Sequence, residues 1–106
     1  MELKRPYKKL ARGGFEVLAR APDLDSLADD RDGIRSPFIV YEEDVALGPA
    51  HSPLAAVVKF GHGRFAHWKG LGFIFSSSDG TEPVFTGRRY FVGLQTAPDI
   101  FGGGQR

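Results

Sequence analysis

The segment 63–83, GRFAHWKGLGFIFSSSDGTEP, constrains the fold more than any other part of the chain. Aromatic and β-branched residues fill two short runs, 64–68 and 71–75, which are separated by the turn sequence Lys-Gly. Such runs favour a pleated sheet, and a short turn that contains glycine joins two antiparallel strands directly. The segment therefore predicts a β-hairpin that ends where the polar run Ser-Ser-Ser-Asp-Gly begins.

Three further segments, 15–21, 36–42 and 88–94, are rich in aromatic and aliphatic residues and are predicted to be strands. The segment 36–42 is apolar on both faces, which indicates a strand covered on both sides. Residues 45–47 are expected to return beside it, and residues 83–85 to be extended. The predicted fold is mostly β: a small antiparallel sheet or sandwich-like domain of five to six short strands with one short helix. Its core is predicted to contain Phe38, Val40, Phe65, Phe73 and Phe75.

The one helix is predicted over residues 54–60. Ser52 is a suitable N-cap, Pro53 fits the first helical position, and Gly61 fits the position after the last turn. Leu54, Val57 and Val58 would form its apolar stripe.

At 106 residues the chain has the length of one domain. Residues 1–14 are expected to form a basic N-terminal arm, 15–95 a single β-rich domain, and 96–106 a flexible glycine-rich tail. The acidic segment 23–35 is expected to be a loop with one helical turn near 24–28. Its DDRDG sequence lacks the alternating ligands of an EF-hand.

Composition excludes several classes of protein. The chain has no cysteine, so it has neither disulfides nor thiolate metal sites. The formal net charge is +1, which gives no reason to expect nucleic acid as a partner. No apolar run is long enough for a transmembrane helix, and the N-terminus lacks the apolar region of a secretory signal. The expected location is the cytoplasm, and no membrane partner or cofactor is expected.

Four segments, SPFIVYEEDVALGPAHS, GRFAHWKG, FSSSDGTEP and GRRYFV, resemble an accessory module of unassigned activity that occurs in bacterial proteins beside glycosyltransferase- and methyltransferase-type domains. The similarity runs in order from about residue 15 to residue 92. The chain departs from the module's pattern in four places: Val45 replaces a turn glycine, Ala66 a serine, Thr81-Glu82 a Ser-Asp pair and Thr86 an asparagine. The resemblance implies a compact accessory domain with a link to glycans. The matching residues are Tyr41, Glu42, Gly48, Pro49, Ala50, His51, Ser52, Gly63, Arg64, Phe65, His67, Trp68, Ser76, Ser78, Asp79, Pro83, Gly87, Arg88 and Tyr90.

The histidine and serine residues are candidates for metal binding and catalysis. His51, His62 and His67 have no recognised ligand spacing, so no metal site is expected. Ser52 follows His51 directly, which could suggest a hydrolase, but the His-Ser-Pro sequence is more typical of a helix start than of a nucleophile. No catalytic residues are therefore predicted.

The polar and aromatic residues around the hairpin are the candidates for a ligand site, although a structural role is the favoured interpretation. Aromatic rings suit the apolar faces of sugars, and a few convergent polar groups orient a ligand in a pocket. The alternative is that Trp68 belongs to the core and that Arg88 and Arg89 protect a strand edge. The candidate binding residues are Arg64, His67, Trp68, Ser78, Asp79, Arg88 and Tyr90.

The sequence thus predicts a non-catalytic accessory or binding module, with carbohydrate as the first candidate ligand. The second candidate is a protein-interaction or self-assembly module, whose partner would be an adjacent enzyme domain or a second copy of the chain. The third is a small hydrolase that uses His51 and Ser52.

Overall fold

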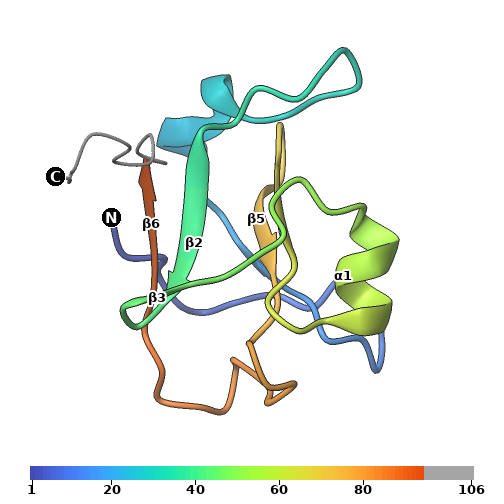
Figure 1. Cartoon of the computed structure of the whole chain (residues 1–106), viewed down its shortest axis with the longest axis vertical. Coiled ribbons are helices and arrows are strands. Elements are labelled where there is room, and N and C mark those ends of the chain that lie inside the picture. The colour runs from blue at the N-terminus through green and yellow to red at the C-terminus, as the bar shows by residue number, and fades with distance from the viewer. Residues whose placement is uncertain (95–106) are drawn as a thin grey trace, which may run out of the picture.

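The computed structural model describes residues 1–94; the predicted tail, 96–106, lies outside them. The described chain forms two antiparallel sheets of three strands each (Figure 1). One sheet has the order β1-β5-β4, formed by β1 (Val17–Ala19), β5 (Gly72–Phe75) and β4 (Phe65–Trp68). The other has the order β3-β2-β6, formed by β3 (Val45–Ala46), β2 (Phe38–Glu42) and β6 (Tyr90–Leu94). The predicted mostly β fold class is confirmed.

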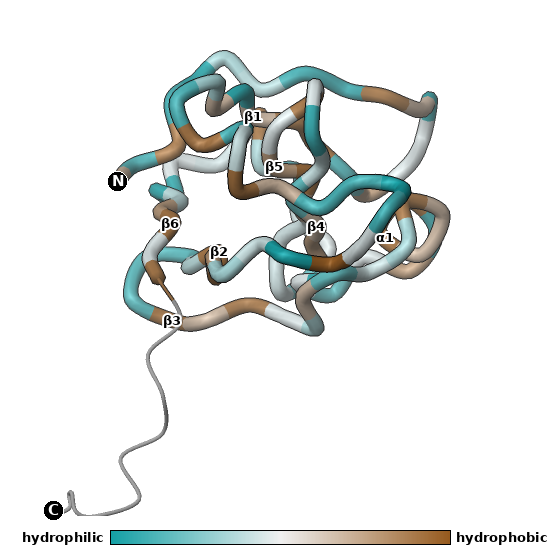
Figure 2. The backbone as a smooth tube through the Cα atoms, turned by 90° about the horizontal axis from the view of Figure 1, so that it is seen from above, coloured by the Kyte–Doolittle hydropathy of each residue, from teal (hydrophilic) through white to brown (hydrophobic). Residues whose placement is uncertain are grey.

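The main core fills the space between the two sheets. Figure 2 views the layers from above, with β2 and β6 on one side, β1, β5 and β4 in the middle, and the helix α1 (Leu54–Phe60) beyond them. Alternate residues of each strand point to the same face, so both sheets direct an apolar set inward. The five predicted core residues, Phe38, Val40, Phe65, Phe73 and Phe75, are all buried in this single cluster. Their predicted packing is confirmed.

The predicted hairpin is present as β4 and β5, with Phe65 opposite Phe75 and Trp68 opposite Gly72. Trp68 therefore lies at the turn end of the hairpin, while the polar run that starts at Ser76 leaves from the other end. Trp68 and the candidate residues of the polar run, Ser78 and Asp79, therefore lie at opposite ends of the hairpin.

Helix α1 covers the outer face of the β1-β5-β4 sheet. Val57 packs there against Leu18 of β1 and Ile74 of β5. The predicted helix bounds are confirmed. The predicted N-cap is wrong, because Pro53 occupies that position and the Ser52 hydroxyl donates a 2.7 Å hydrogen bond to the Pro49 carbonyl instead.

The first residues are not the separate arm expected from their charge. Leu3 and Tyr7 are buried in the main core. The backbone of Leu3 donates to the Tyr90 carbonyl at 2.8 Å, and Lys8 and Leu18 exchange two backbone hydrogen bonds. Apolar residues at positions 3 and 7 thus fasten the segment to both sheets while its basic side chains remain at the surface.

Three local predictions differ from the structure. The first strand covers only 17–19, and the exposed Phe15 lies beside the end of α1 rather than in the strand. The expected helical turn is a longer 3-10 helix, η1 (Pro22–Leu27). Residues 83–85 form a turn closed by a 3.0 Å hydrogen bond from the Phe85 N–H to the Glu82 carbonyl, so they are not extended.

Candidate functional site

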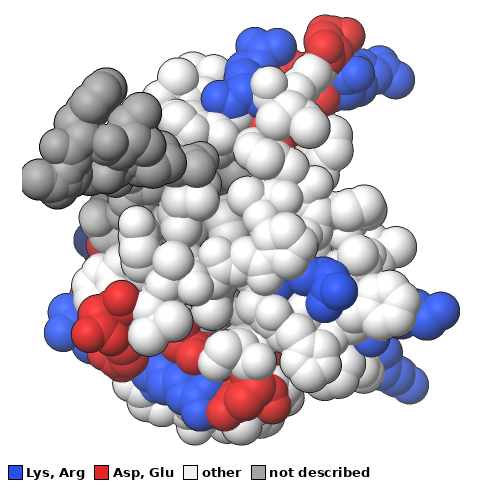
Figure 3. Space-filling view, in the orientation of Figure 1, with Lys and Arg blue, Asp and Glu red and all other residues white. Residues whose placement is uncertain are grey.

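Four of the seven candidate residues gather around the carboxylate of Glu42, which was not itself a candidate binding residue. Ser78 donates to Glu42 through both its hydroxyl and its backbone N–H, and Tyr90 donates at 2.8 Å. Arg88 lies 3.3 Å from the same carboxylate and forms a bidentate pair with Asp79. Figure 3 shows acidic and basic side chains next to one another along the lower edge of the molecule in that view.

The electrostatics of this cluster favour a structural role. Burial would raise the pKa of Glu42, but the hydrogen bonds from Ser78 and Tyr90 outweigh it and lower that pKa. Hydrogen bonds from Arg88 and Thr81 hold the pKa of Asp79 well below its usual range. The charged groups therefore pair with one another and fasten the 76–82 loop to β2 and β6.

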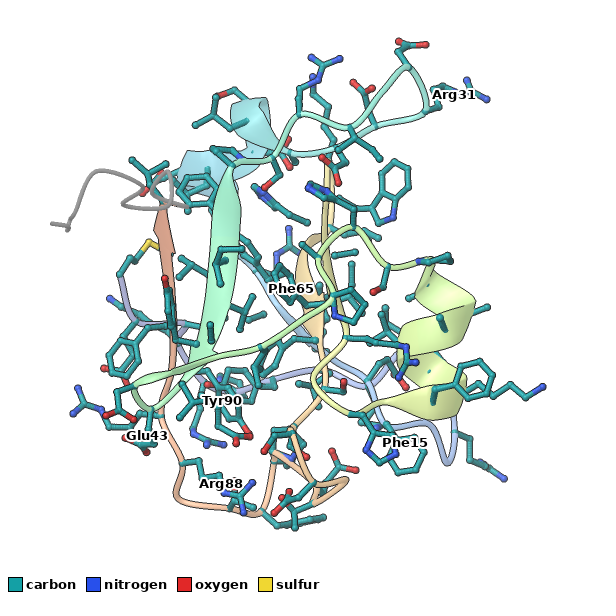
Figure 4. The ribbon with its side chains drawn as sticks, in the orientation of Figure 1. Phe15, Arg31, Glu43, Phe65, Arg88 and Tyr90 are labelled. Atoms are coloured by element: carbon teal, nitrogen blue, oxygen red, sulfur yellow. The ribbon has the colours of Figure 1, made fainter. Side chains whose placement is uncertain are left out.

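The other candidates lie elsewhere. Figure 4 places Arg88 and Tyr90 at one end of the molecule and Arg31, in the loop that also carries Asp29 and Asp30, at the opposite end. Arg64 donates to the Gly61 carbonyl at 3.1 Å and lies over the Phe60 ring. The seven residues predicted as one site are thus divided among separate regions.

His67 belongs to the core rather than to a pocket. Its ring stacks on Phe73 with centroids 4.0 Å apart, and its Nδ1 lies 2.7 Å from the Ser36 hydroxyl. Its Nε2 is buried without a hydrogen-bond partner among the described residues. Burial lowers the pKa of His67, although Asp29 and Asp25 act in the opposite direction. A neutral ring at this position fits the apolar surroundings.

Trp68 is half-buried and lines a pocket with a volume of about 610 Å³, which is larger than two other hollows of about 190 and 260 Å³. Apolar side chains form most of the wall, and three of them, Ile34, Leu54 and Leu71, are otherwise exposed. The remaining lining residues are Asp29, Asp30, His51, Ser52, Pro53 and Ala66. A few polar groups in a mainly apolar hollow are typical of a small-molecule site.

The polar part of this pocket is a pair formed by His51 and Asp29. His51 Nδ1 lies 2.6 Å from Asp29 Oδ2. The other oxygen of Asp29 accepts 2.8 Å hydrogen bonds from the backbone N–H groups of Arg35 and Ser36. Burial would raise the pKa of Asp29, but these donors and His51 together lower it, so the carboxylate is ionised. An ionised Asp29 requires the His51 proton to sit on Nδ1.

The second ring nitrogen of His51, which lines the pocket, is left without a partner. Within residues 1–94, Nε2 has no hydrogen bond and is not among the buried unpaired atoms. The backbone of His51 has a φ of +56°, a left-handed conformation that non-glycine residues seldom adopt. Strained positions of this kind cluster at functional sites. His51 is therefore held by both its backbone and its Asp29 partner.

The sequence places His51 beside Ser52 and, as a candidate metal ligand, with His62 and His67, but it does not pair His51 with Asp29. The two residues of the pair are 22 positions apart, and Asp29 lies in a loop with several other acids. The structure records no hydrogen bond between His51 and Ser52 among the described residues. The only signal in the sequence was the histidine itself, within the GPAHS motif.

Among residues 1–94 no group of three or more His, Cys, Asp or Glu side chains is arranged to hold a metal ion. No helix in that range is both long enough and apolar enough to span a bilayer. Comparison of the chain with protein-family models, curated proteins and solved structures gave no match.

Proposed function

We propose that this protein is a small-molecule-binding domain whose ligand occupies the pocket between Trp68, the 29–35 loop and the start of α1. The observation that carries the proposal is the His51–Asp29 pair, which lines a hollow whose other walls are mainly apolar and which engages only Nδ1 of the imidazole. The ligand would place an apolar part against Trp68 and Leu71, and a hydroxyl group at His51.

The charges around the pocket favour a neutral ligand over an anion. Asp29 and Asp30 both line it, and the nearby cation Arg35 lies 3.4 Å from Asp30. An anionic ligand would be repelled by the two carboxylates, whereas an uncharged hydroxyl group can hydrogen-bond to His51 without that repulsion. We therefore place carbohydrates that carry an apolar substituent first among the ligand classes.

The test is a titration of the intrinsic fluorescence of Trp68, which is the only tryptophan in the sequence. Octyl, phenyl and methyl glycosides of one sugar are compared below their micellar concentrations, with octanol as the sugar-free control. Octyl and phenyl glycosides should bind more tightly than the methyl glycoside, since each buried methylene contributes about 0.8 kcal/mol. Octanol should bind less tightly than octyl glycoside.

Two leucine variants form a matched pair. Leu71 and Leu10 are 39% and 41% exposed, but only Leu71 lines the pocket. Leu71→Asp should weaken binding at least tenfold because it replaces the apolar contact of the ligand's substituent by a charged group, while Leu10→Asp should not. Equal losses in both variants, or an unchanged emission with every ligand, would count against the proposal.

A further inference from the structure

We infer that the pocket also has a hydrolytic activity, in which His51 is a general base that activates water against a carboxylic ester bound there. The inference rests on the proposed function, because the ester must first occupy the same pocket. Its basis is the combination of a fixed imidazole tautomer, an open Nε2 and an apolar wall beside it.

A general base needs a lone pair aimed at the reacting proton and a fixed ring. Asp29 supplies the orientation, since its 2.6 Å contact keeps the His51 proton on Nδ1 and leaves the lone pair on Nε2. Asp29 is itself held by two backbone N–H groups, so the pair cannot turn freely. Asp29 is thus a positioning residue, and His51 is the catalytic one.

Water is the nucleophile in this scheme, because the Ser52 hydroxyl is not positioned to act as one. The Ser52 hydroxyl donates its hydrogen to the Pro49 carbonyl at 2.7 Å rather than to His51. Ser52 is also buried, so it does not present its oxygen freely to a ligand.

In the reaction, Nε2 takes a proton from water while the water oxygen bonds to the ester carbonyl carbon. The carbonyl electron pair moves to its oxygen and a tetrahedral anion forms. When the carbonyl re-forms, the bond to the alkoxide breaks and the proton on Nε2 passes to the alkoxide oxygen. The products are a carboxylic acid and an alcohol, and nothing is oxidised or reduced. Asp29 remains ionised and stabilises the transient imidazolium.

The class of substrate follows from the wall of the pocket and from the single base. Ile34, Leu54 and Leu71 would cover an acyl or aryl group. Hydrolysis of an ester needs one proton to be taken from water and one to be given to the departing alkoxide. A single histidine can do both, one after the other. The geometry points to esters of hydroxylated compounds, with the acyl group against the apolar wall.

The experiment measures hydrolysis of 4-nitrophenyl butyrate by the full chain, with glucose pentaacetate as a second substrate. The key variant is His51→Asn, since asparagine tolerates a positive φ. His62→Asn is its matched control: His62 is exposed, has a φ of +54° and does not line the pocket. The His62→Asn variant shows how much of the ester hydrolysis comes from a histidine that is merely exposed at the surface.

Asp29→Asn tests the positioning role separately. Its amide oxygen can still accept from the backbone of Arg35 and Ser36, while its NH₂ group would donate to His51 Nδ1. That hydrogen bond moves the imidazole proton to Nε2 and removes the base without removing the ring. The split between kcat and KM separates positioning from a merely structural role: Asp29→Asn should lower kcat, because the base is lost, while the KM for the ester should change little, because the ring and the apolar wall remain.

We expect His51→Asn and Asp29→Asn to lower kcat/KM about 100-fold or more, and His62→Asn to leave it unchanged. Circular dichroism and thermal melting establish that each variant is folded. Wild-type hydrolysis no faster than that of His51→Asn would overturn the inference. If glycosides still change the Trp68 emission in that case, the proposed binding function stands alone. If they do not bind either, both proposals fail.

Discussion

Glu42 and Tyr90 face each other in the β2–β6 register, and their side chains are also joined by a 2.8 Å hydrogen bond from the Tyr90 hydroxyl to Glu42 Oε2. Both residues are buried, and the same carboxylate holds Ser78 of the following loop. The Glu42–Tyr90 pair thus connects strands β2 and β6 to the 76–82 loop that follows β5. Residues that resemble a ligand site in the sequence here stabilise the fold.

Replacing Tyr90 by phenylalanine tests this role. Tyr90→Phe should lower the free energy of unfolding by about 1.5–3 kcal/mol, because it removes a hydrogen bond to a buried charged group. Urea denaturation measures the change. The control is Tyr41→Phe, since the Tyr41 hydroxyl has no hydrogen bond within the described residues and its loss should cost about 0.5 kcal/mol or less. Equal effects of the two changes would contradict the assignment.

His67 should make stability depend on pH. Its pKa is lowered by burial, so between the folded pKa and the unfolded value of about 6.5 only the unfolded chain binds the proton. Stability should therefore be full above about pH 7 and fall as the pH is lowered through that window, with a slope of at most about 1.4 kcal/mol per pH unit.

The measurement is urea denaturation of wild type, His67→Gln and His62→Asn across that pH range. His67→Gln should be less stable at pH 7.5 but should show a shallower decline towards pH 5. His62 is exposed, so its variant should keep the wild-type slope. A His67→Gln slope identical to that of wild type would show that the acid sensitivity arises from other groups.

Gly72 should tolerate no side chain. Its φ is +129°, and a Cβ atom there would lie 2.3 Å from the Ala19 carbonyl oxygen of the neighbouring strand. Gly72→Ala should therefore cost about 2–5 kcal/mol, combining backbone strain with a clash. Gly70→Ala, with a φ of +83° and open space, should cost only about 1–2 kcal/mol. Similar costs at the two positions would refute the close approach of β1 and β5.

Folding should not require a metal ion. No ligand spacing is recognised in the sequence, and no cluster of three ligands exists within residues 1–94. Thermal melting with and without EDTA should give midpoints within about 1 °C, because a structural metal site would contribute folding free energy that a chelator removes. A decrease of several degrees would return His51, His62 and Asp79 to consideration as ligands.

Much of the fold was predictable because its signals are local. Residues 54–60 are helical between a proline and a glycine, and the two aromatic runs around Lys69-Gly70 form the hairpin as expected. The arm of residues 1–14 was misjudged because its basic residues obscured Leu3 and Tyr7, which the core buries. A charge pattern indicates exposure of particular side chains, not of a whole segment.

The sequence by itself determined the strand-rich architecture, the helix and the inward set of phenylalanines, since periodicity and turn residues act over a few positions. Only the tertiary structure decided which polar groups meet. It brought Asp29 to His51 across 22 residues, and it joined Ser78, Asp79, Arg88 and Tyr90 at Glu42, far from Trp68. Such pairings depend on how the two sheets pack and where the loops close, and neither is encoded in the spacing of residues along the chain.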